Sequence, residues 1–307
     1  MELRLQTGTA GYAPARGARA GTEFDPSLVE CGNPACAGSW LTYLKDRRRP
    51  VLEGQWACSA RCMQTMVETA IRRETTETVF TVGSREHRHR MPLGLILLAQ
   101  GWITNEQLQR ALDLQRRAGQ GRIGEWLIAK CGVDQDRVLR GLGLQWQSPV
   151  LSVAGFDPAA MTWTVPKALI ERTGVVPLRI ASGRILYLGW EDRPDAAVAF
   201  AIARMSGLRV ESGLVDTAEL GRARQQLCGC PFVKATVEQV GNTELLAQRM
   251  ASVLARMRPR ASHLVRVHHL YWLRMWLEMG SMSPREGDVP ATGDDVVDCV
   301  YLVGSEQ

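Results

Sequence analysis

Two stretches of the chain repeat each other without a gap at an offset of thirty residues. Each opens with an apolar residue and a glycine, and ends with two apolar residues four apart and a glutamine three residues later. The matched pairs are Leu93 and Ile123, Gly94 and Gly124, Leu97 and Leu127, Ile103 and Val133, Leu108 and Val138, Leu112 and Leu142, and Gln115 and Gln145. Positions three and four apart share one face of a helix, so each repeat predicts a short helix followed by a longer amphipathic helix.

The residues between the paired positions are suited to ending one helix and starting the next. Gly101 in the first repeat and Cys131-Gly132 in the second supply a turn, and Thr104 and Asp134 are favoured N-cap residues. The sequence therefore predicts a pair of helical hairpins that together form one domain over residues 91–146.

These repeats resemble the motif of the N-terminal domain of type II secretion and type IV pilus assembly ATPases, the GspE/MshE N-terminal family. That motif runs Arg-Leu-Gly-x-x-Leu, a glycine, then Leu-x3-Leu-x2-Gln. The similarity continues through Gln145 to Val150, Asp157-Pro158, Val165-Pro166, Val176 to Leu178 and Gly207 to Val210, and covers about Arg90 to Leu227. It implies that the paired motifs bind cyclic-di-GMP. The expected ligand contacts are then Leu93, Gly94, Leu97, Leu108, Leu112, Gln115, Arg122, Ile123, Gly124, Leu127, Val138, Leu142 and Gln145.

The chemistry of these residue types fits such a ligand. Cyclic-di-GMP has two guanines and two phosphates related by a two-fold axis, and a duplicated motif offers two equivalent half-sites. A glycine lets the backbone approach a phosphate or a base edge, and Arg122 can bond guanine or phosphate in bidentate fashion. In the first motif Pro92 stands where the arginine is expected, and in the second Cys131 stands where the glycine is expected. The apolar positions also suit a simple helical core, so ligand binding and core packing both remain open.

Four cysteines near the N-terminus have the spacing of a metal site. They form two close pairs, Cys31 with Cys36 and Cys58 with Cys62. Two such pairs supply the four thiolates that a structural Zn²⁺ needs, and the alternative is four buried cysteines without metal. The stretch from Trp56 to Cys62 resembles the second half of FCS and MYM type treble-clef zinc fingers, where the second pair opens a helix. We expect Trp56, with Trp40 and Tyr43 from the spacer, to pack beside the metal.

Several classes of function are disfavoured by what the chain lacks. No Gly-x4-Gly-Lys-Ser/Thr phosphate loop is present, and no nucleophile, base or paired carboxylates stand in a recognisable catalytic setting, so we expect no enzyme. No apolar stretch approaches the ~20 residues of a membrane span, and Met1 to Glu23 lacks the apolar core of a signal peptide, which favours a cytoplasmic location. The net charge is +5 and the arginines are scattered, so nucleic acid is an unlikely partner.

The fold class expected is an α+β multidomain protein: a small treble-clef zinc module, a helical tandem-repeat domain, a small α/β sandwich, and a C-terminal helix plus β-hairpin. The predicted ranges are a flexible tail over 1–28, the zinc module over 29–75, a basic linker over 76–90, the repeats over 91–146, the α/β subdomain over 147–227 and a C-terminal region over 228–307. In the α/β subdomain, Val150 to Val153 predicts a strand, and the turn Ala181 to Arg184 between two apolar runs predicts a hairpin loop. In the C-terminal region, Thr243 to Met257 predicts a helix. The run His263 to Glu278 is compatible with a long strand or a helix, and we favour a strand that forms a hairpin with Val296 to Val303. In such a strand, His268 and His269 lie on opposite faces.

Three interpretations follow. The first is a non-catalytic regulatory protein that binds cyclic-di-GMP and relays it to a partner. The second is a protein adaptor of secretion or pilus type machinery that has kept the fold with a degenerate ligand site. The third is a zinc-finger regulator that binds nucleic acid. Arg122, both glutamines and both glycine pairs favour the first, and Pro92 favours the second.

Overall fold

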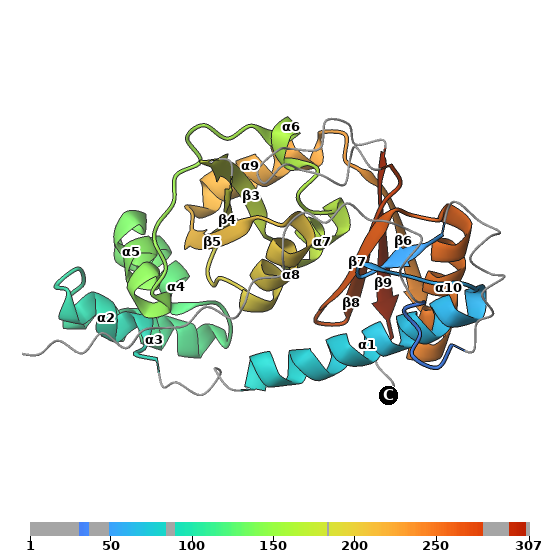
Figure 1. The fold of residues 1–307 in the computed structure, drawn as a ribbon. Coiled ribbons are helices and arrows are strands. Elements are labelled where there is room, and N and C mark those ends of the chain that lie inside the picture. Colours follow the sequence, from blue (N-terminus) through green and yellow to red (C-terminus); the bar gives the residue numbers. More distant parts are fainter. Residues whose placement is uncertain (1–30, 37–48, 84–89, 183, 279–294, 305–307) are drawn as a thin grey trace, which may run out of the picture. The chain divides into compact units, whose positions relative to one another are not determined.

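The computed structural model describes residues 31–36, 49–83, 90–182, 184–278 and 295–304. The predicted N-terminal tail, with Trp40 and Tyr43 of the cysteine module, lies outside the described residues. The chain combines helices with several small sheets, so the mixed α/β class expected from the sequence is confirmed (Figure 1).

The N-terminal module consists of a short hairpin and one long helix. Its elements are β1 (Val51–Leu52), β2 (Gln55–Trp56) and α1 (Ala60–Gly83). The turn between the strands has positive φ at both Glu53 and Gly54, the conformation that a two-residue hairpin requires. Helix α1 starts between Cys58 and Cys62, as predicted, and extends into the stretch predicted as a basic linker.

The two repeats form the four helices α2 (Leu93–Ala99), α3 (Asn105–Ala118), α4 (Ile123–Cys131) and α5 (Gln135–Trp146). The predicted N-caps are confirmed: Thr104 accepts a hydrogen bond from the Gln107 amide, and Asp134 accepts one from the Asp136 amide. The helices of one repeat do not pack only on each other, because α2 lies mainly against α5 and α3 mainly against α4. The two repeats are thus interlocked rather than stacked side by side.

The next part of the chain builds a three-stranded sheet with helices. Its elements are α6 (Pro158–Met161), α7 (Lys167–Thr173), β3 (Val176–Ala181), β4 (Ile185–Trp190), α8 (Ala196–Ser206), β5 (Arg209–Leu214) and α9 (Thr217–Cys228). The hairpin predicted at residues 181–184 is confirmed, since β3 and β4 pair antiparallel, and β5 joins β4 in parallel. The strand predicted from Val150 to Val153 is wrong: Val150 makes only an isolated bridge to Leu214.

The C-terminal part is a helix with a four-stranded sheet, which is larger than the predicted helix plus hairpin. Its elements are β6 (Lys234–Val240), α10 (Thr243–Met257), β7 (Ala261–Val267), β8 (Leu270–Trp276) and β9 (Val296–Val303), in the sheet order β6-β9-β8-β7. Helix α10 and the pairing of β8 with β9 are confirmed. The single strand predicted from His263 to Glu278 is wrong, because the chain reverses at His268, which has φ +56°, and His269. The two histidines therefore form a turn instead of lying on opposite faces of a strand.

In this C-terminal sheet, strands β7, β8 and β9 are buried on both faces. Val265, Trp272 and Val300 pack into the core of the three-stranded part, whereas Leu273 and Cys299 pack against α1 and α10. A strand buried on both faces reads as a continuous apolar run without alternation. This explains why the run looked like one long element in the sequence.

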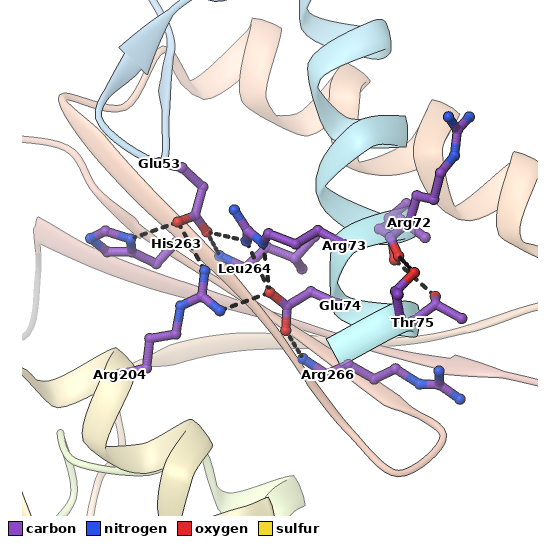
Figure 2. Close-up of polar contacts among 11 residues, drawn as sticks. Glu53, Arg72, Arg73, Glu74, Thr75, Arg204, His263, Leu264 and Arg266 are labelled. Atoms are coloured by element: carbon purple, nitrogen blue, oxygen red, sulfur yellow. Dashed lines mark hydrogen bonds and ion pairs between the residues drawn. The ribbon is translucent and has the colours of Figure 1, made fainter. Parts of the chain in front are cut away.

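Two carboxylates cover the free edge of β7 (Figure 2). Glu53, from the β1–β2 turn, accepts a hydrogen bond of 2.8 Å from the Leu264 amide, and Glu74 of α1 accepts one of 3.1 Å from the Arg266 amide. Arg204 of α8 bridges both carboxylates, at 3.2 Å from Glu53 and 2.8 Å from Glu74. The carboxylates take the place that a further strand would occupy. Arg204 and Arg73 together balance their two charges, since Arg73 also pairs with Glu53 at 3.3 Å and with Glu74 at 2.9 Å.

The environment of Glu53 strongly favours its ionised form. Burial alone would raise its pKa, but the hydrogen bonds from His263 and the Leu264 amide, with the charges of His263 and Arg204, lower that pKa to about 2. Glu53 therefore remains a charged acceptor throughout the physiological pH range.

Candidate functional site

A pocket of about 580 Å³ lies beside the second repeat. Both repeats contribute to its wall, the first through Leu93 and the second through Ile123 and Gly124. Its other lining residues are Arg122, Glu125, Ile128, Gln135, Val138, Leu139, Leu142, Gln145, Trp146, Glu191, Asp192, Arg193, Asp216 and Thr217. The wall is thus apolar along the helices, with charged groups from the loops.

The thirteen residues expected at a ligand divide into two groups. Seven line the pocket: Leu93, Arg122, Ile123, Gly124, Val138, Leu142 and Gln145. The pocket wall does not include the other six, Gly94, Leu97, Leu108, Leu112, Gln115 and Leu127, and of these Gly94, Leu97, Leu108 and Leu127 are buried in the core of the repeats. The structure therefore brings the second motif to the pocket more fully than the first.

The paired glycines serve the packing of the helices. A Cβ atom on Gly94 would lie 2.5 Å from a methyl group of Leu108, and one on Gly124 would lie 3.0 Å from a methyl group of Val138. In each repeat the missing side chain therefore lets the first helix contact the second. Gly124 also lies in the pocket wall, so its role there is compatible with both interpretations left open by the sequence.

The paired glutamines form two equivalent hydrogen bonds, each from the end of one repeat to the start of the other. Gln115, at the end of the first repeat, donates a hydrogen bond of 2.8 Å to the carbonyl of Gly121, just before Arg122. Gln145, at the end of the second, donates one of 3.0 Å to the carbonyl of Met91, just before Pro92. Since Met91 and Gly121 are thirty residues apart, each repeat holds the start of the other in an equivalent way.

Arg122 stands at the N-terminus of α4 and forms an ion pair with Asp192, in the loop after β4. More than half of the Arg122 side chain is exposed, so the guanidinium is accessible from solvent. The sequence patterns do not indicate Glu191, Asp192, Arg193 or Asp216, because no spacing connects these residues to the repeats. Of these residues, only Asp216 has a local signal in the sequence, because aspartate is a favoured N-cap residue and Asp216 caps α9. In the structure it also accepts a hydrogen bond from Gln135.

The four N-terminal cysteines come together as predicted. All four Sγ atoms lie within 4.8 Å of one another, with Cys36 and Cys58 at 3.4 Å and Cys58 and Cys62 at 3.5 Å. Tetrahedral thiolates at a Zn–S distance of about 2.3 Å are separated by about 3.8 Å, so the cluster has the size of a metal centre. These cysteines can hold a metal ion. Trp56 on β2 is buried, and its ring lies 4.1 Å from the guanidinium carbon of Arg49.

The cysteines differ in their tendency to ionise. Burial, and then the neighbouring thiols, raise the pKa of Cys58 to about 12. Burial also opposes ionisation of Cys62, but hydrogen bonds with Ser59 and Asn33 lower the pKa of this thiol to about 7. Of these two thiols, Cys62 therefore ionises more readily, and the charge of a bound cation would favour ionisation of Cys58.

Comparisons with known proteins give matches among solved structures. No protein-family model and no curated protein matches the chain. MshE with cdg is similar at 23% identity and a TM-score of 0.38, covering 45% of this chain and 99% of the other. The N-terminal domain of XpsE is similar at 16% identity and a TM-score of 0.32, covering 45% of this chain and 98% of the other. Each of these two matches covers slightly less than half of this chain.

In the described part of the chain, no helix combines the length and the apolar character that crossing a bilayer requires.

Proposed function

We propose that this protein is a cytoplasmic, non-catalytic regulator that binds cyclic-di-GMP in the pocket beside Arg122. The observation that carries the proposal is that both repeats meet in one pocket, through Leu93 and through Ile123 and Gly124. A ligand with two equivalent halves suits a site built from a duplicated motif. Val138 and Leu142 offer an apolar platform for a base, while Arg122 and Gln145 offer polar groups to its edges and phosphates.

The ion pair of Arg122 with Asp192 suggests how the ligand would be relayed. A phosphate or guanine that bonds Arg122 competes with Asp192 for the guanidinium. Asp192 lies in the loop that leads into α8, and Arg204 of α8 bridges Glu53 and Glu74 at the edge of the C-terminal sheet. We infer that the position of this loop carries the state of the pocket to the rest of the chain, where a protein partner of secretion or pilus type would read it.

Calorimetry with cyclic-di-GMP tests the proposal. Arg122→Ala should abolish detectable binding, because a hydrogen bond to a charged group contributes roughly 1.5 to 3 kcal/mol, or about ten-fold or more in affinity. Pro92→Arg should strengthen binding by restoring the charge of the first motif. Arg116→Ala is the matched control, since Arg116 is an exposed arginine of α3 that pairs with Asp113 outside the pocket.

If neither the wild type nor Pro92→Arg gives a heat of binding with cyclic-di-GMP at high micromolar concentration, the proposal of a cyclic-di-GMP receptor is overturned. The interpretation as a protein adaptor would then be favoured, and the ion pair of Arg122 with Asp192 would be a fixed structural contact of that adaptor. Turnover of ATP by the rigorously purified chain would contradict the non-catalytic assignment.

We also propose that Cys31, Cys36, Cys58 and Cys62 hold one structural Zn²⁺. Four protein thiolates leave no position for a substrate, so the ion would hold the β1–β2 hairpin against the start of α1. Metal analysis should find about one zinc per chain in the wild type and in Cys230→Ser, and none in Cys58→Ser. A wild type that is free of metal and keeps its fold in chelator would overturn the zinc site.

A further inference from the structure

The two edges of the four-stranded C-terminal sheet differ. At β7, Glu53 and Glu74 cover the edge by bonding its backbone amides (Figure 2). At the other edge, β6 pairs only with β9, and in the described part of the chain no further strand pairs with its outer side. The register of β6 with β9 also runs without a shift, so no bulge interrupts this edge. The β6 edge therefore lacks the covering that the β7 edge has.

The backbone groups on the outer side of β6 belong to alternate residues. Val240 directs its carbonyl toward β9, since it accepts a hydrogen bond of 3.1 Å from the Gly304 amide. Backbone groups alternate between the two sides of a strand, so Ala235, Val237 and Gln239 direct their N–H and C=O groups outward. All three residues are exposed. An extended segment that lies beside them can therefore add a strand to the sheet.

We propose that the β6 edge binds a second copy of this chain, with the two β6 strands antiparallel about a two-fold axis at Val237. In this register Val237 faces Val237 of the second copy, and Ala235 faces Gln239 of the second copy. Each pair joins residues whose backbone groups are directed outward, so each pair exchanges both of its N–H···O=C bonds. The two four-stranded sheets then form one continuous sheet.

The charges on β6 favour a second copy in this orientation. Lys234 begins the strand and Glu238 lies four residues later, so both side chains are on one face of the sheet. Antiparallel copies place Lys234 of each strand diagonally beside Glu238 of the other, which is an attractive arrangement. Parallel copies in register would instead place like charges opposite each other. The strand is thus complementary in charge to its own antiparallel copy.

Two exposed apolar side chains flank this edge, one on each face of the sheet. Val237 is 54% exposed and shares a face with its register partner Val300. On the other face, Glu238 pairs at 3.3 Å with Arg249 of α10. Leu245, which is 37% exposed, lies one helical turn before Arg249 on the same side of α10. Pairing of two copies brings Val237 against its own counterpart and removes apolar surface from water.

Sedimentation velocity on the full chain tests the dimer. A single edge strand gives a small interface, so the wild type should dimerise in the micromolar range. Val237→Lys places two like charges at the two-fold axis and should weaken the dimer by about ten-fold or more. Val237→Pro should also weaken it, because it removes an outward N–H that β9 does not use. Phe200→Lys, at an exposed apolar position of α8, is the control and should dimerise like the wild type.

Cross-linking through introduced cysteines tests the register. Facing residues of such a pair have Cα atoms about 5.5 Å apart, which a disulfide can span. With oxygen and a copper catalyst as oxidant, Val237→Cys should form a disulfide-linked dimer. Ala235→Cys should link to Gln239→Cys in a mixture of the two variants, and not to itself. The wild type, with its eight native cysteines, gives the background.

Three outcomes would overturn the proposal. A wild type that stays monomeric at high micromolar concentration would exclude the dimer and leave the β6 edge to an extended segment of another protein. A dimer that is unchanged in both Val237 variants, shown by thermal unfolding to be folded, would place the contact between copies elsewhere. Linkage of Ala235→Cys to itself, with none at Val237→Cys, would exclude the two-fold axis at Val237.

Discussion

Two interfaces in this chain are held by different kinds of hydrogen bond. We call the interface between the two repeats the repeat seam, and the interface between the N-terminal module and the C-terminal sheet the charged seam. Between the repeats, Gln115 and Gln145 bond backbone carbonyls, and the groups involved are neutral on both sides. Between the N-terminal module and the C-terminal sheet, Glu53 and Glu74 bond backbone amides, and two arginines balance their charges. The first seam joins a motif to its own copy, and the second joins segments about two hundred positions apart.

Because of this difference, the two seams should respond differently to pH and to salt. A neutral amide bond to a carbonyl does not titrate, so the repeat seam is insensitive to pH and nearly so to salt. A carboxylate seam depends on ionisation and on the arginines that hold it.

The two repeats should be equally important to stability. Leu97 and Leu127 occupy matched positions, and both are fully buried. Leu97→Ala and Leu127→Ala should each lower the free energy of unfolding by roughly 2 to 5 kcal/mol, within about 1 kcal/mol of each other. Urea denaturation measures this, and a large cost in only one variant would show that the repeats are not interlocked as described.

Removing one carboxylate should open the charged seam. Glu74→Ala takes away the acceptor of the Arg266 amide and the ion-pair partner of Arg73 and Arg204. Because Glu74 is buried, the expected loss is about 3 kcal/mol. Glu68→Ala, at an exposed position of the same helix, is the control and should cost less than about 0.5 kcal/mol. Equal costs in the two variants would contradict the edge-covering role.

Acid should weaken the charged seam and spare the neutral one. The pKa of Glu53 is lowered in the folded state to about 2, so its contribution is present above the unfolded value near 4.5 and is lost as pH falls toward 2. Its contribution should be on the order of 1 to 3 kcal/mol. Hydrogen exchange between pH 4.5 and 2.5, corrected for intrinsic rates, should show protection falling at the Leu264 amide and holding at Leu127. Glu53→Gln should flatten the response at Leu264, and an unchanged slope in that variant would assign the effect to another group.

The glutamines should have the smallest effects. Gln115→Ala and Gln145→Ala should each cost about 0.5 to 1.5 kcal/mol, equally and at any pH, since each removes one hydrogen bond to a carbonyl. Unfolding measured at two pH values checks this. Only Gln145 lies in the pocket wall, so cyclic-di-GMP affinity should fall directly in Gln145→Ala, and in Gln115→Ala only through the position of Arg122. A strong dependence on pH in either variant would end the contrast between the seams.

Local signals in the sequence were sufficient for much of the fold. The repeat helices, the caps Thr104 and Asp134, and the limits of α10 follow from patterns within a few residues. Helix α9 was missed although Leu220, Ala223 and Leu227 mark one buried face. Strand β6 was missed because it lies at an edge and is mostly exposed, so only Ala235, Val237 and Val240 are apolar and the alternation is too short to mark a strand.

The tertiary contacts that these elements make could mostly not be predicted from the sequence. Cysteine spacing predicted the cluster because thiols that share a metal must lie close together in space. The pairing of Arg122 with Asp192 joins residues seventy positions apart, and no property of either residue indicates the other. The crossed packing of the repeats was likewise missed, because a thirty-residue period is the same whether hairpins stack or interlock.

Interlocked repeats have a consequence for how this domain folds. In a stacked array each unit meets only its neighbour, so folding can nucleate in one unit and spread. Here the bond from Gln145 to Met91 spans 54 positions, and α2 has its main partner at the far end of the domain. Closing that loop has an entropic cost before any partial structure is stabilised, so the four helices should form in one cooperative step. A fragment that holds a single repeat should therefore be unstructured, and only a chain with both copies should acquire the pocket.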